Sequence, residues 1–388
     1  MKKLCAILLL AALVLCLAAC GQKNQPDLSL MNQQESANSS GEAPAEIPSN
    51  AGGTANVIRE DTLPNGCKYV LTSNGELSFS DANITENLKN VDVISSYISS
   101  VTTVRVESGV EEIGDSVFSG FEGLQRVIIG DSVTKIGRNA FADCTALKEV
   151  RLGSGITSIG NRAFAGCTAL TGMDFGRNVK DFGTDVFDGC AALSSITVDS
   201  DLPAHSFEGL TSLKDVSFGD HVTRIGSYAF ANCSSLKYIT FGSGLTAVDD
   251  YAFKGCVALN SIRIPSSVVT LGDECFSGCT ALSTIEIDEG GELEIGYCSF
   301  AGCTSLKTVA LSESVTKVGE KAFSYCTSLE KFVLPKSLKE IGYGILEGCD
   351  NLRVLAYRGT NAEWNKVTKN NRWNNGLYLG VTEFNSKL

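Results

Sequence analysis

Cysteine is the residue type in this chain with the widest chemistry, because a thiol can form a disulfide, bind a metal or stay buried as a small group. The chain has 15 cysteines among 388 residues. Cys5, Cys16 and Cys20 lie near the N-terminus. Nine of the others share one position of a repeated phrase, three residues after a phenylalanine or its equivalent: Cys144, Cys167, Cys190, Cys233, Cys256, Cys279, Cys303, Cys326 and Cys349.

These nine cysteines would stack about 4.8 Å apart if the repeated copies stack as strands, which is within reach of a disulfide. All nine side chains would point the same way, however, so we interpret them as buried thiols that act as small hydrophobic groups. Disulfide bonds and metal binding are the alternatives. The closest pairs, Cys275 with Cys279 and Cys298 with Cys303, do not resemble a known metal motif. We therefore expect no metal and no cofactor.

Residues for catalysis are scarce. The only histidines are His205 and His221, and the chain contains no nucleotide-binding loop, metalloprotease helix or nucleophile elbow. The tetrapeptide Gly-Asp-Ser-Val occurs twice, with Ser116 and Ser132 as candidate nucleophiles of a lipase-like block. Because the two copies occupy different positions of the repeat and the matching histidine block is absent, we interpret both as polar turns. We therefore expect that the protein is not an enzyme.

Two copies of the phrase are irregular. The copy between Phe187 and Phe207 lacks three residues, and Asp199, Asp201, His205 and His221 cluster around it. This copy could form a pocket, although simple loop shortening is the interpretation we favour. A one-residue insertion accompanies four carboxylates within 288–294. Calcium prefers such oxygen ligands, but a solvated acidic turn is the favoured interpretation here as well.

The repeated phrase itself is about 23 residues long, which lies in the range of leucine-rich repeats. A leucine follows six residues after each phenylalanine, and an Ile-Gly step precedes most of them, as in Ile159-Gly160. Eight of the ten intervals between the marker residues are 23 residues, one is 20 and one is 24. The marker residues are Phe118, Phe141, Phe164, Phe187, Phe207, Phe230, Phe253, Phe276, Phe300, Phe323 and Leu346. The chain is therefore predicted to be a solenoid.

Each copy combines two periodicities. Ala140, Phe141, Cys144 and Leu147 occupy relative positions zero, one, four and seven, which predicts a short helical turn. The alternation in 149–152 predicts a strand with one face in the core. Glycine, or an Asp or Asn substitute, stands two residues after most of the phenylalanines and predicts a turn with positive φ.

The solvent side of the strands is the natural binding surface, because stacked strands present a continuous sheet. From its two rows of outward residues we select a candidate binding surface of Arg126, Glu149, Arg151, Asp174, Asp215, Tyr238, Thr240, Arg263, Glu286 and Lys331. The rows turn apolar around Ala310, Val333, Val354 and Ala356. Such a cluster could be a contact site, or Trp364 or Trp373 could cover it as a cap.

The N-terminus indicates export. Lys2 and Lys3 precede an apolar run from Leu4 to Ala19, which is typical of a secretory signal. The run ends in Leu-Ala-Ala-Cys20-Gly, which resembles the bacterial lipoprotein cleavage box and implies that Cys20 carries lipid. An ordinary signal with an accidental cysteine is the alternative. Residues 22–56 have the composition of a flexible spacer.

Charge narrows the class of partner. Without Lys2 and Lys3 the chain keeps 30 basic and 44 acidic residues, a net charge of −14. An acidic surface of this kind argues against nucleic acid as a partner.

Together the phenylalanine, cysteine, leucine and Ile-Gly positions resemble the BspA-type leucine-rich-repeat surface proteins of bacteria. Their repeat looks like Leu-x-x-Ile-x-Ile-Pro-x-x-Val-x-x-Ile-Gly-x-x-Ala-Phe-x-x-Cys, and Pro265 and Pro335 preserve its proline. The segment 66–79 is similar to the hairpin that opens many such proteins, and 357–364 to their closing segment. The resemblance implies a surface-exposed, non-enzymatic protein that binds other macromolecules, such as a host matrix or cell-surface component, in adhesion or cell contact. A solute-capture lipoprotein for glycans or peptides and a structural envelope component are the alternatives.

The expected fold is an α/β repeat protein, a right-handed leucine-rich-repeat solenoid with a strand and a short helical turn in each repeat. We expect a lipoprotein signal peptide at 1–19, a lipidated flexible linker at 20–55, an N-terminal hairpin cap at 56–105, the solenoid at 106–357 and a C-terminal cap at 358–388. The predicted partners are a protein or other surface macromolecule and, through Cys20, the cell membrane.

Overall fold

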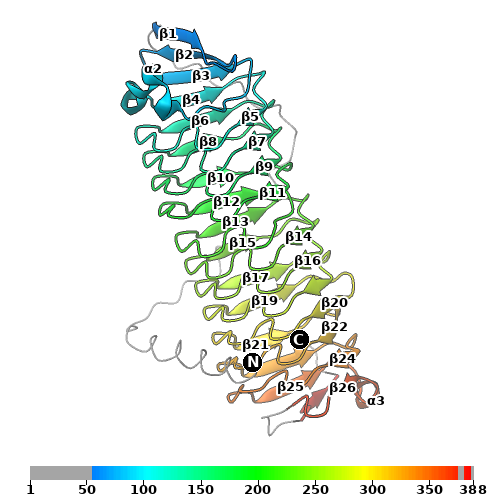
Figure 1. The fold of residues 1–388 in the computed structure, drawn as a ribbon. Helices are drawn as coiled ribbons and strands as arrows, with labels where there is room; N and C mark the ends of the chain where they lie inside the picture. Colours follow the sequence, from blue (N-terminus) through cyan, green and yellow to red (C-terminus); the bar gives the residue numbers. More distant parts are fainter. Residues whose placement is uncertain (1–54, 375–379, 386–388) are drawn as a thin grey trace, which may run out of the picture. The chain divides into compact units, whose positions relative to one another are not determined.

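The alternating stretch of each repeat forms a short strand, as predicted, and the strands of successive copies pair in parallel (Figure 1). The computed structural model describes residues 55–374 and 380–385. The register is constant from coil to coil: Ser195 lies opposite Asp215, and Asp215 opposite Tyr238. The strands of this first ladder are β4 (Thr103–Val106), β6 (Arg126–Ile129), β8 (Glu149–Arg151), β10 (Gly172–Asp174), β12 (Ser195–Val198), β13 (Asp215–Phe218), β15 (Tyr238–Thr240), β17 (Ser261–Ile264), β19 (Thr284–Ile287), β21 (Thr308–Ala310), β23 (Lys331–Leu334) and β25 (Val354–Tyr357). Their pairing is interrupted between β8 and β10, between β15 and β17, and between β19 and β21.

A second parallel ladder runs along another side of the coils, formed by the residues around the Ile-Gly step. It is continuous from β5 to β11 and again from β14 to β26, with an interruption between β11 and β14. Its strands are β5 (Glu112–Ile113), β7 (Lys135–Ile136), β9 (Ser158–Ile159), β11 (Asp181–Phe182), β14 (Arg224–Ile225), β16 (Ala247–Val248), β18 (Thr270–Leu271), β20 (Leu293–Ile295), β22 (Val315–Val318), β24 (Glu340–Ile341) and β26 (Thr368–Lys369).

The third side of each coil, which we call the turn face, runs from two residues before the phenylalanine to two residues after it. A helical turn was predicted here, but residues 101–360 contain turns and no helix. The reason lies in the hydrogen bonds: the N–H of Phe141 donates to the carbonyl of Ala163 in the next coil at 2.8 Å, not to its own chain segment. The protein is therefore a β-solenoid whose coils are bonded to each other on three sides.

Two residues of each turn face adopt positive φ. The predicted one, two residues after the phenylalanine, is present in Asp143 at 60° and Gly166 at 74°. The other stands two residues before the phenylalanine and was not predicted, because its residue types do not indicate it. It comprises Ser116, Asn139, Arg162, Asp185, His205, Tyr228, Tyr251, Glu274, Cys298 and Lys321. At all of these positions except Asp185, the residue's N–H donates to the next coil, and these bonds offset the cost of a conformation that most side chains disfavour.

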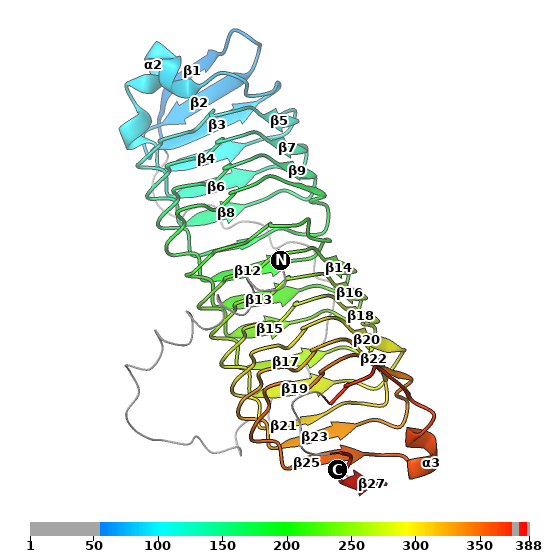
Figure 2. The same cartoon turned by 60° about the horizontal axis from the view of Figure 1, so that its bottom comes forward.

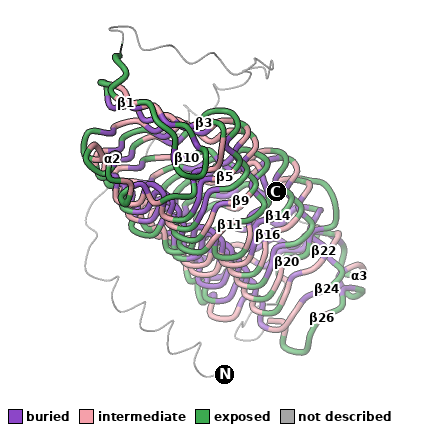
Figure 3. The backbone as a smooth tube through the Cα atoms, turned by 45° about the horizontal axis from the view of Figure 1, so that its top comes forward, coloured by how far each residue is buried: buried purple, intermediate pink, exposed green. Residues whose placement is uncertain are grey.

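Inside the solenoid the phenylalanine rings form one stack, with neighbouring centroids such as those of Phe141 and Phe164 5.3 Å apart. The shared cysteines pack beside it, and each thiol donates to the carbonyl of a phenylalanine in the preceding coil. Cys144 reaches the Phe118 carbonyl at 3.2 Å, and Cys349 reaches that of Phe323 at 3.1 Å. Buried and exposed segments alternate within every coil (Figure 3). The thiols are therefore weak hydrogen-bond donors as well as small apolar groups.

Extra elements occupy the two ends of the ladders (Figure 2). Strands β1 (Val57–Thr62), β2 (Lys68–Thr72) and β3 (Glu76–Ser80) pair antiparallel, and β3 continues in parallel into β4. Three short helical segments follow: η2 (Leu88–Asn90), α2 (Asp92–Ser95) and η3 (Ile98–Ser100). At the other end stand α3 (Asn361–Trp364) and β27 (Glu383–Phe384), which pairs with β25. No helix in the described part of the chain is long and apolar enough to span a membrane.

The glycine of the Ile-Gly step is required by the close approach of successive coils. A Cβ atom on Gly160 would lie 2.7 Å from both the amide nitrogen of Arg138 and the carbonyl carbon of Gly137. Real Cβ atoms do not approach backbone so closely, so a side chain there would force two coils apart.

We predict that Gly160→Ala lowers the free energy of unfolding by about 1–3 kcal/mol, as overpacking does elsewhere. The measurement is the urea midpoint of the full chain. Gly291→Ala is the matched control, because the nearest atom to its new Cβ would be Val269 Cγ1 at 3.8 Å. Equal losses in both variants would contradict this account of the glycine.

Candidate binding surface

The candidate binding residues lie on the solvent side of the first ladder, and we call them the strand-row surface. Eight of the ten are exposed, whereas Glu149 and Lys331 are half-buried. Two of them stand out: Tyr238 keeps 57% of its surface exposed, and the Arg263 side chain keeps 70%. Because the residues between them on each strand point into the core, this surface is fixed by the same alternation that builds the fold.

The strand-row surface divides into two main groups. The first surrounds Glu149, whose carboxylate accepts hydrogen bonds from Arg126 Nε at 3.0 Å and Arg151 Nε at 2.6 Å. Partial burial opposes the charge on Glu149, but the two arginine bonds outweigh it and lower the pKa of its carboxyl. A shallow depression of about 380 Å³ lies over β8, β10 and β12, where Gly172 provides no side chain.

The second group lies on β13 to β19. Asp215 and Tyr238 are neighbours in register, and Thr240 follows on the same strand as Tyr238. Arg263 lies opposite Glu286 and donates from Nε to Asp288 at 3.0 Å. Lys331 lies farther along, on β23. The structure therefore does not gather the ten residues at one point but spreads them along the ladder.

The apolar end of the rows is not an exposed contact site. Val333 retains only 2% of its surface and Ala356 none, while Ala310 and Val354 are half-buried. Trp364 is buried at this end of the solenoid, where its ring contacts Tyr357 and Trp373 at centroid distances of 5.1 and 5.3 Å. The burial of Val333 and Ala356 argues against an exposed contact site, and the cap stays a prediction.

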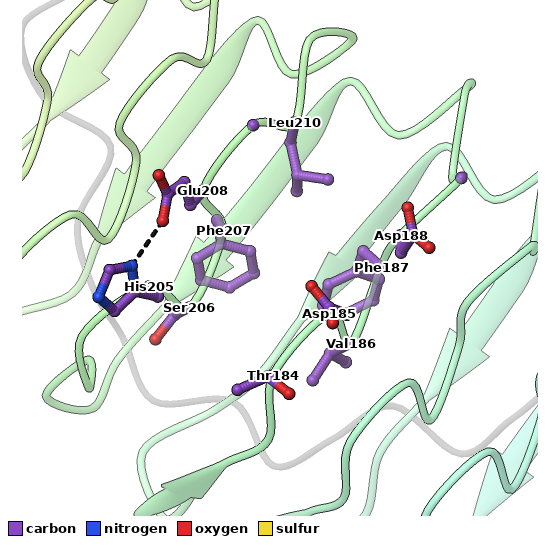
Figure 4. A pocket seen from close by; sticks show the side chains of 12 residues that line it. Thr184, Asp185, Val186, Phe187, Asp188, His205, Ser206, Phe207, Glu208 and Leu210 are labelled. Carbon is purple, nitrogen blue, oxygen red and sulfur yellow. Dashed lines mark hydrogen bonds and ion pairs between the residues drawn. The ribbon is translucent and has the colours of Figure 1, made fainter.

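The short copy produces a pocket, contrary to the favoured interpretation of simple shortening. A cavity of about 510 Å³, which we call the slot, lies between residues 184–189 and 205–210 (Figure 4). Asp199, Asp201, His205 and His221, which cluster around this copy in the sequence, form hydrogen bonds within the solenoid. Asp199 accepts from His221 Nδ1 at 2.9 Å, and His205 bonds Glu208. Asp201 bonds the backbone N–H groups of the next coil.

The remaining sequence candidates do not form sites. The carboxylates of the acidic turn diverge: Asp288 bonds Arg263, and Glu292 bonds Lys339. Ser132 Oγ donates to the Val110 carbonyl at 2.8 Å. Among residues 55–374 and 380–385, no three His, Cys, Asp or Glu side chains gather as a metal site, and none of the twelve cysteines there forms a disulfide. Cys20 lies outside the described residues.

The repeat pattern decides the family. The sequence model of the "BspA type Leucine rich repeat region", in six copies, matches residues 94–204, 200–294 and 291–366. The chain belongs to this family. Among curated proteins, none matches the chain.

Solved structures of bacterial proteins resemble it. A leucine-rich repeat protein from Bacteroides ovatus is 25% identical, covers 78% of this chain and 88% of its own, and has a TM-score of 0.50. A leucine rich cell surface protein from Faecalibacterium prausnitzii is 24% identical, with 81% and 99% coverage and a TM-score of 0.36. A leucine-rich repeat protein from Eubacterium ventriosum is 20% identical, with 87% and 96% coverage and a TM-score of 0.42.

The thiols of these BspA-type repeats are held protonated by their surroundings. Burial raises the pKa of Cys144 and of Cys233 to about 12, against an ordinary value near 8.5. Below about pH 8.5 both the folded and the unfolded chain keep these protons, so the thiols add no pH dependence. Above it only the unfolded chain loses them, and the free energy of unfolding falls as the pH rises toward 12.

We therefore predict that alkylation of Cys144 and Cys233 at pH 9 is about a hundredfold slower or more in the native protein than in urea, since the thiolate is the reactive form. Peptide mass spectrometry measures the modification of each cysteine separately. Over the same range the urea midpoint should fall between pH 8.5 and 10.5. Rapid modification of either cysteine in the native protein at pH 8 would show that the thiol is not protected as described.

Proposed function

We propose that this protein is a non-enzymatic surface lipoprotein of a bacterium whose strand-row surface binds a protein or another surface macromolecule. The proposed role is adhesion or cell contact, with the lipid on Cys20 holding the protein at the membrane and exposing the solenoid at the cell surface. The observation that carries the proposal is the row of outward side chains along the first ladder, which are mostly exposed and polar and include the exposed ring of Tyr238.

A macromolecular ligand suits this surface better than a small one. The strand-row surface is long, and its two main groups lie on different strands, so one ligand must span several coils to touch both. Aromatic residues and arginine contribute most to protein interfaces, and Tyr238 and Arg263 are among the most exposed side chains here. The shallow depression at Gly172 offers room for a protruding side chain of the partner.

The lipid anchor rests on the sequence around Cys20, which lies outside the described residues. The apolar run before this cysteine and the small residues beside it support cleavage and lipidation. A spacer of small and polar residues separates Cys20 from the first strand, β1. Two or more acyl chains would anchor the protein stably.

We predict that Tyr238→Ala weakens binding to a captured surface protein about tenfold or more, because an exposed aromatic anchor would be lost. The ligand is first isolated from host and bacterial surface extracts with residues 56–388, and the affinity is then measured by calorimetry. Arg263→Ala should act in the same direction.

The matched control is Tyr325→Asn. Tyr325 is also exposed, at 45%, but it lies on the turn face with φ 58°, a conformation that asparagine adopts at Asn232. Its replacement should leave binding unchanged. If Tyr325→Asn weakened binding as much as Tyr238→Ala, the strand-row surface would not be the binding site.

A separate prediction concerns the anchor. Cys20→Ser should abolish incorporation of labelled fatty acid and release the protein from the membrane fraction, because no thiol remains to accept lipid. Cys67→Ser serves as the comparison, since Cys67 is buried in the N-terminal region and should not affect labelling. Persistent labelling of the Cys20→Ser protein would overturn the assignment of the anchor.

A further inference from the structure

One junction between coils lacks the hydrogen bonds that all the others have on the turn face. At every other junction between Phe118 and Leu346, three N–H groups of one coil donate to the next coil. They are the N–H of the phenylalanine, the N–H of the residue two positions before it and the N–H of the residue two positions after it. Between the coils of Phe187 and Phe207, which both lie in the described part of the chain, none of these three bonds occurs. Two backbone edges therefore face each other unpaired across the slot.

The cause is the length of the short copy. In other coils a buried aliphatic residue, such as Val179 or Val222, lies between the two strands. The short copy lacks this residue, because it is one of the three that are missing. In addition, Pro203 occupies the position from which the glycine of other coils donates to the preceding coil, and proline has no N–H. The second ladder consequently stops at β11 and resumes at Leu202, which forms an isolated parallel bridge with Ile225 of β14.

Two other contacts keep the junction closed beneath the surface. The first ladder passes through it without interruption, since β12 pairs with β13 in regular register. The Phe187 and Phe207 rings remain 5.9 Å apart, and Phe175 and Phe182 pack against them to fill the core. The opening is thus a surface slot with an aromatic floor, as Figure 4 shows for Phe187 and Phe207.

The walls of the slot carry complementary hydrogen-bonding groups. Asp185, Phe187 and Gly189 have unpaired N–H groups on one wall. On the other wall the corresponding carbonyls belong to Ala204, Ser206 and Glu208, and none accepts a backbone bond. Both sets recur at every second residue, which is the spacing along one edge of an extended strand.

The rim of the slot is acidic. Asp185, Asp188 and Glu208 border the cavity, and all three are exposed. Arg162 pairs with Asp188 at 2.8 Å, and His205 with Glu208, so no partner is seen for the Asp185 carboxylate within the described residues. A ligand with basic side chains would therefore meet favourable charge at the rim.

We propose that the slot binds an extended, lysine- or arginine-containing peptide segment of another protein, which supplies the backbone partners that the junction lacks. Peptides bind exposed sheet edges in this way, with main-chain bonds giving affinity and side-chain contacts giving specificity. The cavity volume of about 510 Å³ lies in the usual range of ligand pockets. This site is on the turn face and does not depend on the proposed function of the strand-row surface.

Charge argues against the chain's own linker and against a second copy as the occupant. Residues 27–46 contain Asp27, Glu35, Glu42 and Glu46 and no basic residue. The whole chain has a net charge of −12. Either occupant would bring negative charge to an acidic rim.

The test uses the full chain in detergent and a fluorescent, acetylated and amidated heptapeptide of alternating lysine and valine. We expect saturable binding by fluorescence polarisation. The double variant Asp185→Asn with Glu208→Gln should weaken it about tenfold or more, because both substitutions keep size but remove rim charge. Glu274→Gln is the control, since Glu274 has the same turn-face position, with φ 54°, at a junction whose bonds are complete.

Three further peptides and one protein variant separate the sources of binding. A version of the peptide with every backbone nitrogen methylated should bind about tenfold more weakly or worse, because its main chain cannot donate to the wall carbonyls. A glutamate-valine peptide and a peptide copying residues 27–46 should also bind more weakly. Tyr238→Ala should bind the lysine-valine peptide like the wild type, since Tyr238 belongs to the other surface.

Several results would overturn the proposal. They are absence of saturable binding, equal binding of the methylated peptide, equal or tighter binding of the 27–46 peptide, equal loss in the Glu274→Gln control, and loss of binding in Tyr238→Ala. Equal binding of the methylated peptide would indicate charge adsorption, and loss in Tyr238→Ala would place the peptide on the strand-row surface.

Discussion

Everything in this solenoid depends on the stacking of one coil on the next at the spacing of neighbouring strands. At this spacing each coil places its phenylalanine ring on the preceding ring, and its thiol donates to a carbonyl of the preceding coil. The glycine of the Ile-Gly step exists because two backbones meet there with no space for a side chain. A single coil could not bury enough apolar surface to remain ordered, so each coil depends on its neighbours for its stability.

The sequence predicts the inward positions and the strand register well, because both follow from stacking identical copies. Once Phe141 and Phe164 mark equivalent positions, Glu149 and Gly172 must be equivalent too, and the rows of the strand-row surface follow. The turn face could not be predicted in the same way. A segment of eight residues with apolar positions at zero, one, four and seven fits a helical turn equally well, and only the hydrogen bonds to the next coil decide against it.

Some of the positive-φ positions can be predicted from the residue type, whereas others depend on contacts with the next coil. Gly166 stands where glycine is expected, and Asp143 is an accepted substitute, so the position is visible in the sequence. Arg162 and Tyr228 adopt the same conformation without any such signal. Their N–H groups donate to the next coil, and these bonds offset the cost of the conformation. At Asp185 the conformation persists although the bond is missing, which leaves a donor directed into the slot.

The irregular copy exposes unpaired backbone groups, which the regular copies do not. A regular coil satisfies its turn-face bonds with its neighbours and offers the solvent only side chains. At the junction of Phe187 and Phe207, two of the three bonded sides are interrupted, while β12, β13 and the four phenylalanines keep the coils together. The missing residues therefore expose backbone without opening the core. Three absent residues and one proline are visible in the sequence, but their effect on the hydrogen bonds can be recognised only by comparing this junction with the complete ones on either side.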